Sequence, residues 1–254
     1  MEFTDQLNRS IFISAPPQRI ISLVPSQTEL LVDLGLEDRL VGVTKFCVHP
    51  KGLRKQKAII GGTKNYRMDI IDSLKPDLII GNKEENEKAG IETFMDKYPV
   101  WMSDINTLED SFDMINSLGK LLGVTKNAEK IITQLKSDFT TPLTKIGTAV
   151  YLIWNDPIMV AGINTFINEM LGFAGFENLI QAARYPQLLD EELINLNPEY
   201  LLLSSEPFPF KESHIQYFQS LLPKAKIRLV DGEMFSWYGS RLLKAKSYFE
   251  HLHY

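Results

Sequence analysis

The stretch Thr125-Lys-Asn-Ala-Glu-Lys-Ile-Ile-Thr-Gln-Leu-Lys-Ser-Asp-Phe-Thr-Thr141 predicts an amphipathic helix around which the rest of the chain is organised. Gly123 is a stop signal for a preceding helix, Thr125 suits an N-cap, and Pro142 ends the run. At about 1.5 Å per residue this helix would be about 25 Å long, the width of a small domain. That length favours a connection between two lobes, and the alternative is a crossover helix within a single sheet. Apolar residues recur along it with helical spacing, at Ala128, Ile131, Ile132, Leu135 and Phe139.

The overall composition is that of an ordinary globular protein. The chain has 254 residues, 44% of them hydrophobic and 23% charged, so it can hold one large domain or two lobes that each have a core. A net charge of −5 with no basic run gives no support for nucleic-acid binding. The single cysteine, Cys47, excludes an internal disulfide framework.

The N-terminus shows no targeting signal. Met1 to Asp5 contain neither a basic region nor an apolar run, and no segment approaches the roughly 20 apolar residues that span a bilayer. As written, the sequence predicts a soluble cytosolic protein. A chain that starts after a removed leader would look the same.

Strands and helices alternate on both sides of the central helix. Arg19 to Val24 form a short apolar run typical of a buried parallel strand, and the following Ser26 and Glu29 have the spacing of a helix capping box. A helix that begins there points its N-terminus to the carboxyl end of the strand, where ligand sites of open α/β sheets collect and anions are favoured. A plain strand-to-helix turn is the alternative. Further strands are expected at residues 11–15, 40–43, 58–60, 78–81, 100–102, 149–153, 200–203 and 227–230. Helices are expected at residues 68–74 and 165–171, and another is expected to end near residue 97.

This order of elements predicts an α/β protein with two parallel-sheet lobes joined by a single long interlobe helix. We assign residues 1–124 to an N-terminal lobe, 125–145 to the interlobe helix, and 146–254 to a C-terminal lobe.

Signatures of enzymes are weak. The sequence has no G-x-G-x-x-G, P-loop, H-E-x-x-H, G-x-S-x-G or C-x-x-C motif. Cys47 and His49 could supply a nucleophile or two metal ligands from one loop, with Glu84 or Glu85 as an acid or base. The structural alternative is a buried cysteine, a surface histidine and a polar loop, and two ligands do not close a metal site. We therefore predict no metal site and no enzyme, and keep the Cys47 enzyme as the weaker hypothesis.

Aromatic residues gather in the loops that follow strands or precede helices. Singly, each could cap a core. Together, they suggest flat apolar walls around a large, partly conjugated ligand. The residues are Phe46, Tyr66, Trp154, Tyr185, Phe208, Trp237 and Tyr238.

An ordered set of motifs resembles the periplasmic cobalamin- and iron-siderophore-binding proteins of ABC importers. The motifs extend over nearly the whole chain, and the resemblance implies two α/β lobes joined by one long helix, with the ligand between them. They are Arg19-Ile-Ile-Ser-Leu-Val-Pro-Ser-Gln-Thr-Glu29, Val41-Gly-Val-Thr44, Ile60-Gly-Gly-Thr63, Leu74-Lys-Pro-Asp-Leu-Ile-Ile80, Ala161-Gly162, Gly175-Phe-Glu-Asn178, Asp190 to Asn197, and Asp231 to Arg241.

The resemblance also implies ligand contacts. Phe46 matches an aromatic contact of the first lobe, Trp154 and Tyr185 match aromatics of the second, and residues 236–238 match a ligand-facing turn. With Tyr66, Trp237 and Tyr238 these form the predicted ligand set. The chain departs from the cobalamin binder at Asn82, which stands in place of an aromatic, and at Thr63, where the loop lacks a tryptophan. The expected ligand is therefore a cobalamin-like, ferric siderophore or haem-like metal chelate, with no covalent cofactor.

The same resemblance implies a partner and a location. Asp69 and Glu191, one in each lobe at a helix start, match carboxylates that dock on an ABC permease and its ATPase, whereas taken alone each is a first-turn acid that favours the helix dipole. We expect a monomer that works in the periplasm or at the cell surface. An intracellular chelate carrier without a permease is the alternative.

Overall fold

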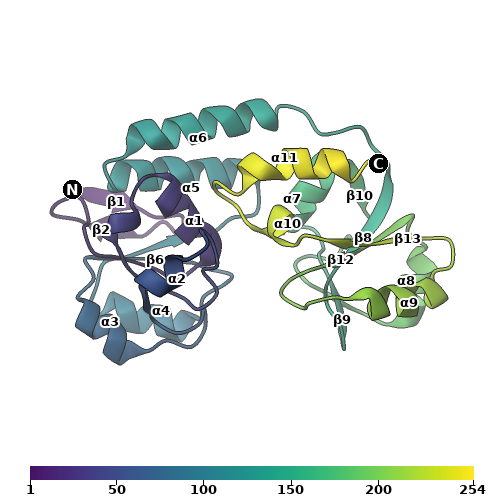
Figure 1. The fold of residues 1–254 in the computed structure, drawn as a ribbon, viewed down its shortest axis with the longest axis horizontal. Helices are drawn as coiled ribbons and strands as arrows, with labels where there is room; N and C mark the ends of the chain where they lie inside the picture. Colours follow the sequence, from purple (N-terminus) through teal and green to yellow (C-terminus); the bar gives the residue numbers. More distant parts are fainter. The chain divides into compact units, whose positions relative to one another are not determined.

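The computed structural model describes residues 1–254 and divides into two compact units (Figure 1). The first unit consists of Met1–Ile105, Glu109–Leu135 and Tyr238–Arg241. The second consists of Asn106–Leu108, Lys136–Trp237 and Leu242–Tyr254. The return of residues 238–241 to the first unit is absent from the expected three-part division. No helix is both long enough and apolar enough to cross a membrane.

The first unit is built on a five-stranded sheet in which every pairing is parallel. The strand order is β5-β4-β3-β6-β7, and β3 and β6 are buried along their whole length, as strands covered on both faces must be. Its strands are β3 (Ile20–Ser22), β4 (Leu40–Val43), β5 (Ala58–Ile59), β6 (Leu78–Asn82) and β7 (Val100–Ser103). Its helices are α1 (Pro25–Asp33), the 3-10 helix η1 (Glu37–Arg39), α2 (Leu53–Gln56), α3 (Met68–Leu74) and α4 (Lys88–Met95), with most of α5 (Leu108–Leu121) and α6 (Thr125–Asp138).

Helix α1 begins differently from the expectation. Its N-cap is Val24, which makes no side-chain cap, and Pro25 takes the first helical position, where its missing N–H costs nothing. The predicted capping box of Ser26 and Glu29 is therefore wrong. Glu29 is instead held by Arg241, a partner more than 200 residues away along the chain, which no local pattern reveals.

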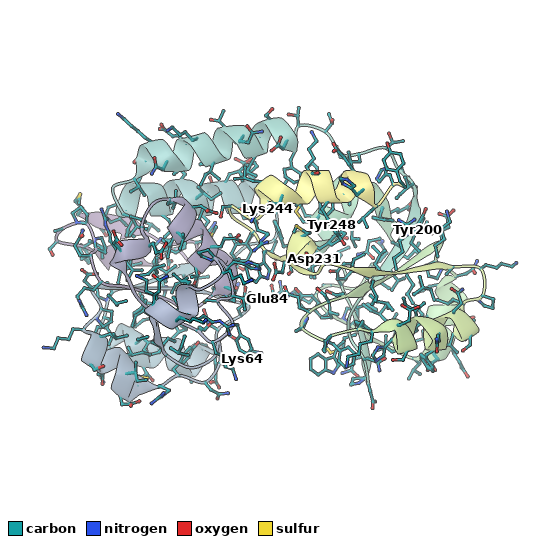
Figure 2. The ribbon with its side chains drawn as sticks, viewed as in Figure 1. Lys64, Glu84, Tyr200, Asp231, Lys244 and Tyr248 are labelled. Atoms are coloured by element: carbon teal, nitrogen blue, oxygen red, sulfur yellow. The ribbon has the colours of Figure 1, made fainter.

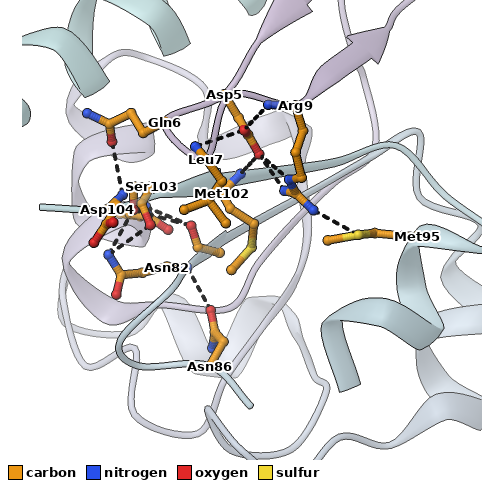
Figure 3. A network of polar contacts seen from close by, with 12 residues as sticks. Asp5, Gln6, Leu7, Arg9, Asn82, Asn86, Met95, Met102, Ser103 and Asp104 are labelled. Atoms are coloured by element: carbon orange, nitrogen blue, oxygen red, sulfur yellow. Dashed lines mark hydrogen bonds and ion pairs between the residues drawn. The ribbon is translucent and has the colours of Figure 1, made fainter. Parts of the chain in front are cut away.

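The N-terminal residues form a separate ribbon that is tied to the sheet. Strands β1 (Glu2–Thr4) and β2 (Ser10–Phe12) pair antiparallel, so the predicted edge strand at 11–15 is shorter and starts earlier. Figure 3 shows how Asp5 anchors this ribbon, because its carboxylate accepts hydrogen bonds from the backbone N–H groups of Leu7 (2.9 Å) and Met102 (3.3 Å) and forms an ion pair with Arg9.

Helices α5 and α6 lie side by side in the first unit (Figure 1). Gly119 allows the close approach, since a Cβ at this position would lie 2.5 Å from the Cβ of Ala128. Helix α6 ends at Asp138, before the predicted end, because Thr140, Thr141 and Pro142 are poor helix formers and the residue before a proline disfavours helical geometry. Its last residues belong to the second unit.

The second unit is built on a six-stranded mixed sheet. The path is β11-β9-β8-β12-β13, and β10 pairs with β8. Its strands are β8 (Gly147–Trp154), β9 (Ile158–Val160), β10 (Phe176–Asn178), β11 (Gln187–Leu188), β12 (Tyr200–Ser204) and β13 (Lys226–Val230). Its helices are α7 (Phe166–Phe173), α8 (Asp190–Leu196), α9 (Glu212–Leu221), α10 (Glu233–Ser236) and α11 (Leu242–His251).

Antiparallel pairing in this sheet corrects the expectation of purely parallel lobes. Strand β9 runs antiparallel to β8, and β11 runs antiparallel to β9. The cause is the short turn around Asp156-Pro157, because a parallel neighbour needs a crossover of about a dozen residues or more. The pairings of β8, β12, β13 and β10 are parallel, so the core of the sheet is as expected.

Candidate functional site

Each sheet has a point where the chain reverses the direction in which strands are added, and ligands of open α/β sheets bind outside the carboxyl ends of the strands there. In the first unit this point lies between β3 and β6, and in the second between β8 and β12. The loops that follow these strands are therefore the candidate ligand-binding regions.

At the first unit's reversal point lies a tyrosine from the far end of the sequence. Tyr238 is buried, and its hydroxyl donates to Oε1 of Glu85 at 3.4 Å. Burial and the neighbouring charge of Glu85 raise its pKa well above the ordinary value. Ser26 and Ser103, at the ends of α1 and β7, are close to it. The sequence predicts that Tyr238 contacts a ligand, and the structure places its ring inside the first unit.

The residues after Tyr238 continue this attachment, and we call Tyr238–Arg241 the clip. The backbone N–H of Gly239 donates to Oγ of Ser111 at 3.1 Å. The Nε of Arg241 donates to Oε2 of Glu29 at 2.8 Å, and both side chains are buried. The clip is thus bonded to α5 and α1 by polar groups that water hardly reaches.

The loop after β6 is organised by Asn82. Its side-chain oxygen accepts from the backbone N–H groups of Glu84 (2.8 Å) and Glu85 (3.1 Å), and its Nδ2 donates to Oγ of Ser103 at 2.9 Å. Asn82 is buried, so it acts on the backbone and presents no surface to a ligand. The arrangement supports the interpretation of Glu84 and Glu85 as members of a polar loop.

The two aromatic residues predicted in the first unit have different environments. Phe46 is 49% exposed, with Nζ of Lys45 5.0 Å from its ring centroid. Tyr66 is half-buried; its ring packs edge-on against Phe94 at 4.9 Å, its hydroxyl donates to the carbonyl of Thr63, and burial raises its pKa to about 12. Phe46 offers a free apolar surface, whereas Tyr66 serves mainly to hold its loop.

The second unit's reversal point carries an exposed aromatic pair. Trp154 ends β8 and is 40% exposed, and its ring centroid lies 5.5 Å from that of Phe208 in the loop after β12. Phe208 in turn packs on Phe210, which belongs to the core. Trp154 is therefore supported from behind and open to solvent.

Glu206, in the same loop, is a polar residue that the sequence analysis missed. Its Oε1 accepts from the indole Nε1 of Trp237 at 2.7 Å and from Oγ of Ser236 at 2.9 Å. Desolvation raises its pKa, the nearby charges of Glu233 and Asp231 add to the rise, and the two hydrogen bonds oppose it. The clue in the sequence is weak: an acid two residues past a buried strand, in Ser204-Ser205-Glu206-Pro207.

The end of β13 completes this edge. The backbone N–H of Asp231 donates to the hydroxyl of Tyr248 on α11 at 2.8 Å, and both residues are marked in Figure 2. Trp237 is buried, with its N–H committed to Glu206. The predicted stacking residue therefore fixes a carboxyl group.

Tyr185 lies apart from this aromatic pair along the sheet. It precedes β11, at the far edge of the strand order, and the guanidinium carbon of Arg184 is 5.6 Å from its ring centroid. Arg184 is itself fixed by hydrogen bonds to Asn106 and to the carbonyl of Asn164. The half-buried Tyr185 ring is thus covered on one face by a cation.

The proposed chemistry of Cys47 finds no support. The thiol is buried, lies 3.1 Å from Oγ1 of Thr28 and 3.2 Å from Oγ1 of Thr44, and burial raises its pKa. A thiol with a raised pKa is a poor nucleophile at neutral pH. No group of three or more histidine, cysteine, aspartate and glutamate side chains is placed to hold a metal ion.

The two predicted docking carboxylates are where the sequence places them. Asp69 lies in the first turn of α3, and Glu191 in the first turn of α8, flanked by Asp190 and Glu192. Both are exposed. Asp69 forms a loose ion pair with Arg67, 3.9 Å away.

Comparison with known proteins identifies the family. Residues 20–220 match the model of the periplasmic binding proteins. The chain belongs to this family. An ABC transporter substrate-binding lipoprotein of Bacillus subtilis, YvrC, is 29% identical over 218 residues, which cover 78% of this chain and 67% of the relative. A vitamin B12-binding protein of Vibrio parahaemolyticus is 27% identical over 197 residues, covering 74% of this chain and 71% of the relative.

The periplasmic binding protein fold is confirmed by solved structures. A possible iron-binding periplasmic solute-binding protein from Staphylococcus epidermidis superposes with a TM-score of 0.80 at 24% identity, covering 94% of this chain and all of that one. These matches confirm the resemblance, the α/β fold class and the substrate-binding function that the sequence implied. Members of the family are binding proteins rather than enzymes.

Proposed function

We propose that this periplasmic binding protein captures a metal chelate outside the cytoplasmic membrane and delivers it to an ABC permease. The family assignment supports a binding role, and the vitamin B12-binding relative and the possible iron-binding structural neighbour support a chelate as the cargo. The observation that carries the proposal is Trp154, a large aromatic held open to solvent at a reversal point, backed by Phe208.

Trp154 and Phe46 are proposed as the main stacking residues, and Tyr185 as a further ligand contact. Each stacked ring would contribute about 0.5–1.5 kcal/mol beyond its buried area. Tyr66, Trp237 and Tyr238 are proposed to support the site by positioning loops, since their rings or polar ends are engaged within the protein.

A titration tests the ligand class. Cyanocobalamin, haemin and the ferric trihydroxamate ferrioxamine B are added to the protein, and quenching of its three tryptophans is followed. At least one chelate should quench strongly, and Trp154→Ala and Phe46→Ala should each weaken its binding about tenfold. Phe12→Ala, which removes an exposed ring from β2, is the control and should not change affinity. Failure of all three chelates to bind would refute the proposal.

Delivery to a permease is tested separately. Asp69→Lys and Glu191→Lys should abolish chelate uptake by cells and leave binding in solution unchanged. Glu212→Lys, which alters an equally exposed first-turn acid on α9, is the matched control and should transport normally. Normal uptake by both docking variants would favour a carrier that works without a permease.

A further inference from the structure

The strongest unused feature is the carboxyl group of Glu206. It belongs to the loop after β12, beside the proposed stacking residue Trp154, whose ring partner Phe208 lies two positions further on. Both of its hydrogen bonds, from Trp237 and Ser236, go to Oε1. The second oxygen, Oε2, makes no bond within the protein, although the residue is largely buried.

The protein is shaped to hold this carboxyl group in place. Gly232 lies so close that a Cβ there would be 2.7 Å from Cγ of Glu206 and 2.4 Å from Oγ of Ser204. The Ser204 hydroxyl donates to the Glu206 carbonyl, and the Ser205 hydroxyl accepts from the N–H of Gly232 at 2.9 Å. A carboxylate fixed through one oxygen presents the other in a defined direction.

The surroundings determine which groups it can accept. The segments that follow β8, β12 and β13 (residues 155–157, 205–211 and 231–237) contain four acids, Asp156, Glu206, Asp231 and Glu233, and a single base, Lys211, which lies at the N-cap of α9. Like charges in a partly desolvated site repel, so a ligand carboxylate would be disfavoured here. An N–H donor would instead form a charge-assisted hydrogen bond.

We propose that Glu206 is a specificity-determining residue whose Oε2 accepts a hydrogen bond from an N–H group of the chelate. The preferred ligands are then chelates that carry amide or ammonium groups and lack free carboxylates. Trp237 acts as a positioning residue through its bond to Oε1. The inference rests on the proposed function and adds the chemistry of the ligand.

Isothermal titration calorimetry at neutral pH compares two pairs of probes. Cyanocobalamin and ferrioxamine B carry amide donors, whereas haemin and ferric citrate carry carboxylates. We expect one of the amide-bearing chelates to bind at least tenfold more tightly than either carboxylate-bearing chelate. Glu206→Gln should cost that chelate at least tenfold in affinity, because the amide NH₂ of glutamine would face the ligand donor, and Glu212→Gln should not change it.

The outcomes separate the inference from the proposed function. Tight binding of haemin or ferric citrate that is weakened by Trp154→Ala would overturn the inference and leave the function standing. Equal affinity of Glu206→Gln and the wild type for an amide-bearing chelate would also overturn it. If none of the four probes binds, both proposals are refuted.

A pH series tests the role of Trp237. Affinity for the amide-bearing chelate should rise as the pH rises through the pKa of Glu206, since the ionised carboxylate is the stronger acceptor. Trp237→Phe removes a hydrogen bond that lowers this pKa, so the midpoint should move to higher pH. Glu206→Gln should abolish the dependence. An unchanged midpoint in Trp237→Phe would overturn the positioning role.

Discussion

The reversal points of the two sheets have the same strand topology, but different side chains lie at them. In the first unit, the space outside β3 and β6 holds the chain's own Tyr238, bonded to Glu85 and buried. In the second unit, the ends of β8 and β12 present Trp154 and a carboxyl oxygen that has no partner in the protein. The same topology thus buries a tyrosine of the chain in one unit and leaves a tryptophan exposed in the other, where we propose that the ligand is recognised. The position of a loop at a reversal point does not decide its role, and its burial and hydrogen bonds do.

The largest expected effect tests the clip in the first unit. Arg241→Ala would leave the carboxylate of Glu29 buried without its cation, and such changes cost about 3–5 kcal/mol of the free energy of unfolding. Urea denaturation measures it. Replacing both residues by methionine should recover most of the loss, because no uncompensated charge remains. If Arg241→Ala unfolds at the wild-type urea concentration, the clip does not stabilise this unit.

The second effect compares the two aromatic residues directly. Tyr238→Ala empties a buried site and should lower the free energy of unfolding by about 3 kcal/mol, whereas Trp154→Ala, at an exposed site, should cost under about 1 kcal/mol. Chelate binding should respond in the opposite order, with Trp154→Ala the weaker binder once both variants are folded. Thermal denaturation and calorimetric titration of both variants measure these differences. A reversed order in either measurement would contradict the assignment of Tyr238 to stability and of Trp154 to ligand binding.

Substitutions of two glycines in the second unit should change the free energy of unfolding by smaller amounts and in opposite directions. Gly232→Ala forces a Cβ against Ser204 and Glu206 and should destabilise the protein by about 1–3 kcal/mol while weakening chelate binding. Gly172→Ala, in the last turn of α7, meets nothing within 4 Å and should stabilise it by about 0.5 kcal/mol. Both values follow from denaturant titrations. Destabilisation by both substitutions would mean that close packing is not the reason for Gly232.

The smallest effect is a pH dependence of stability. Folding raises the pKa of Glu206, so the folded state favours its protonated form. That contribution to stability is complete below the pKa of the unfolded chain and is lost as the pH rises through the higher pKa of the folded protein. Glu206→Gln should therefore gain in melting temperature relative to the wild type on going from acidic to neutral pH. Melting temperatures of the two proteins that change equally with pH would contradict the raised pKa of Glu206 in the folded state.

Local patterns predicted most of the elements. Helix α3 was expected at its observed bounds, and the apolar runs at β4, β6 and β12 were recognised as strands because buried parallel strands are almost continuously apolar. The helix at α6 was recognised from its 3.6-residue spacing, and only its end was misplaced.

What the sequence did not reveal depends on distant partners. The sequence indicates Glu29 as a capping residue, whereas in the fold its carboxylate is paired with Arg241. The hydrogen bond from the N–H of Trp237 to Glu206 likewise appears only in the fold. The antiparallel β9 and β11 are only three and two residues long, too short for a period to show. The ligand-binding role of the aromatic residues stays a prediction, and their division into exposed and buried members required the fold.

The clip also constrains how the molecule is made. Residues 238–241 are synthesised well after residues 1–135, yet they belong to the same compact unit. Until they arrive, Glu29 lacks its cation and the space outside β3 and β6 lacks its tyrosine. The first unit therefore gains its full stability only after residue 241 has been synthesised, and a nascent chain stalled after α6 would hold it in a loosened, protease-sensitive form.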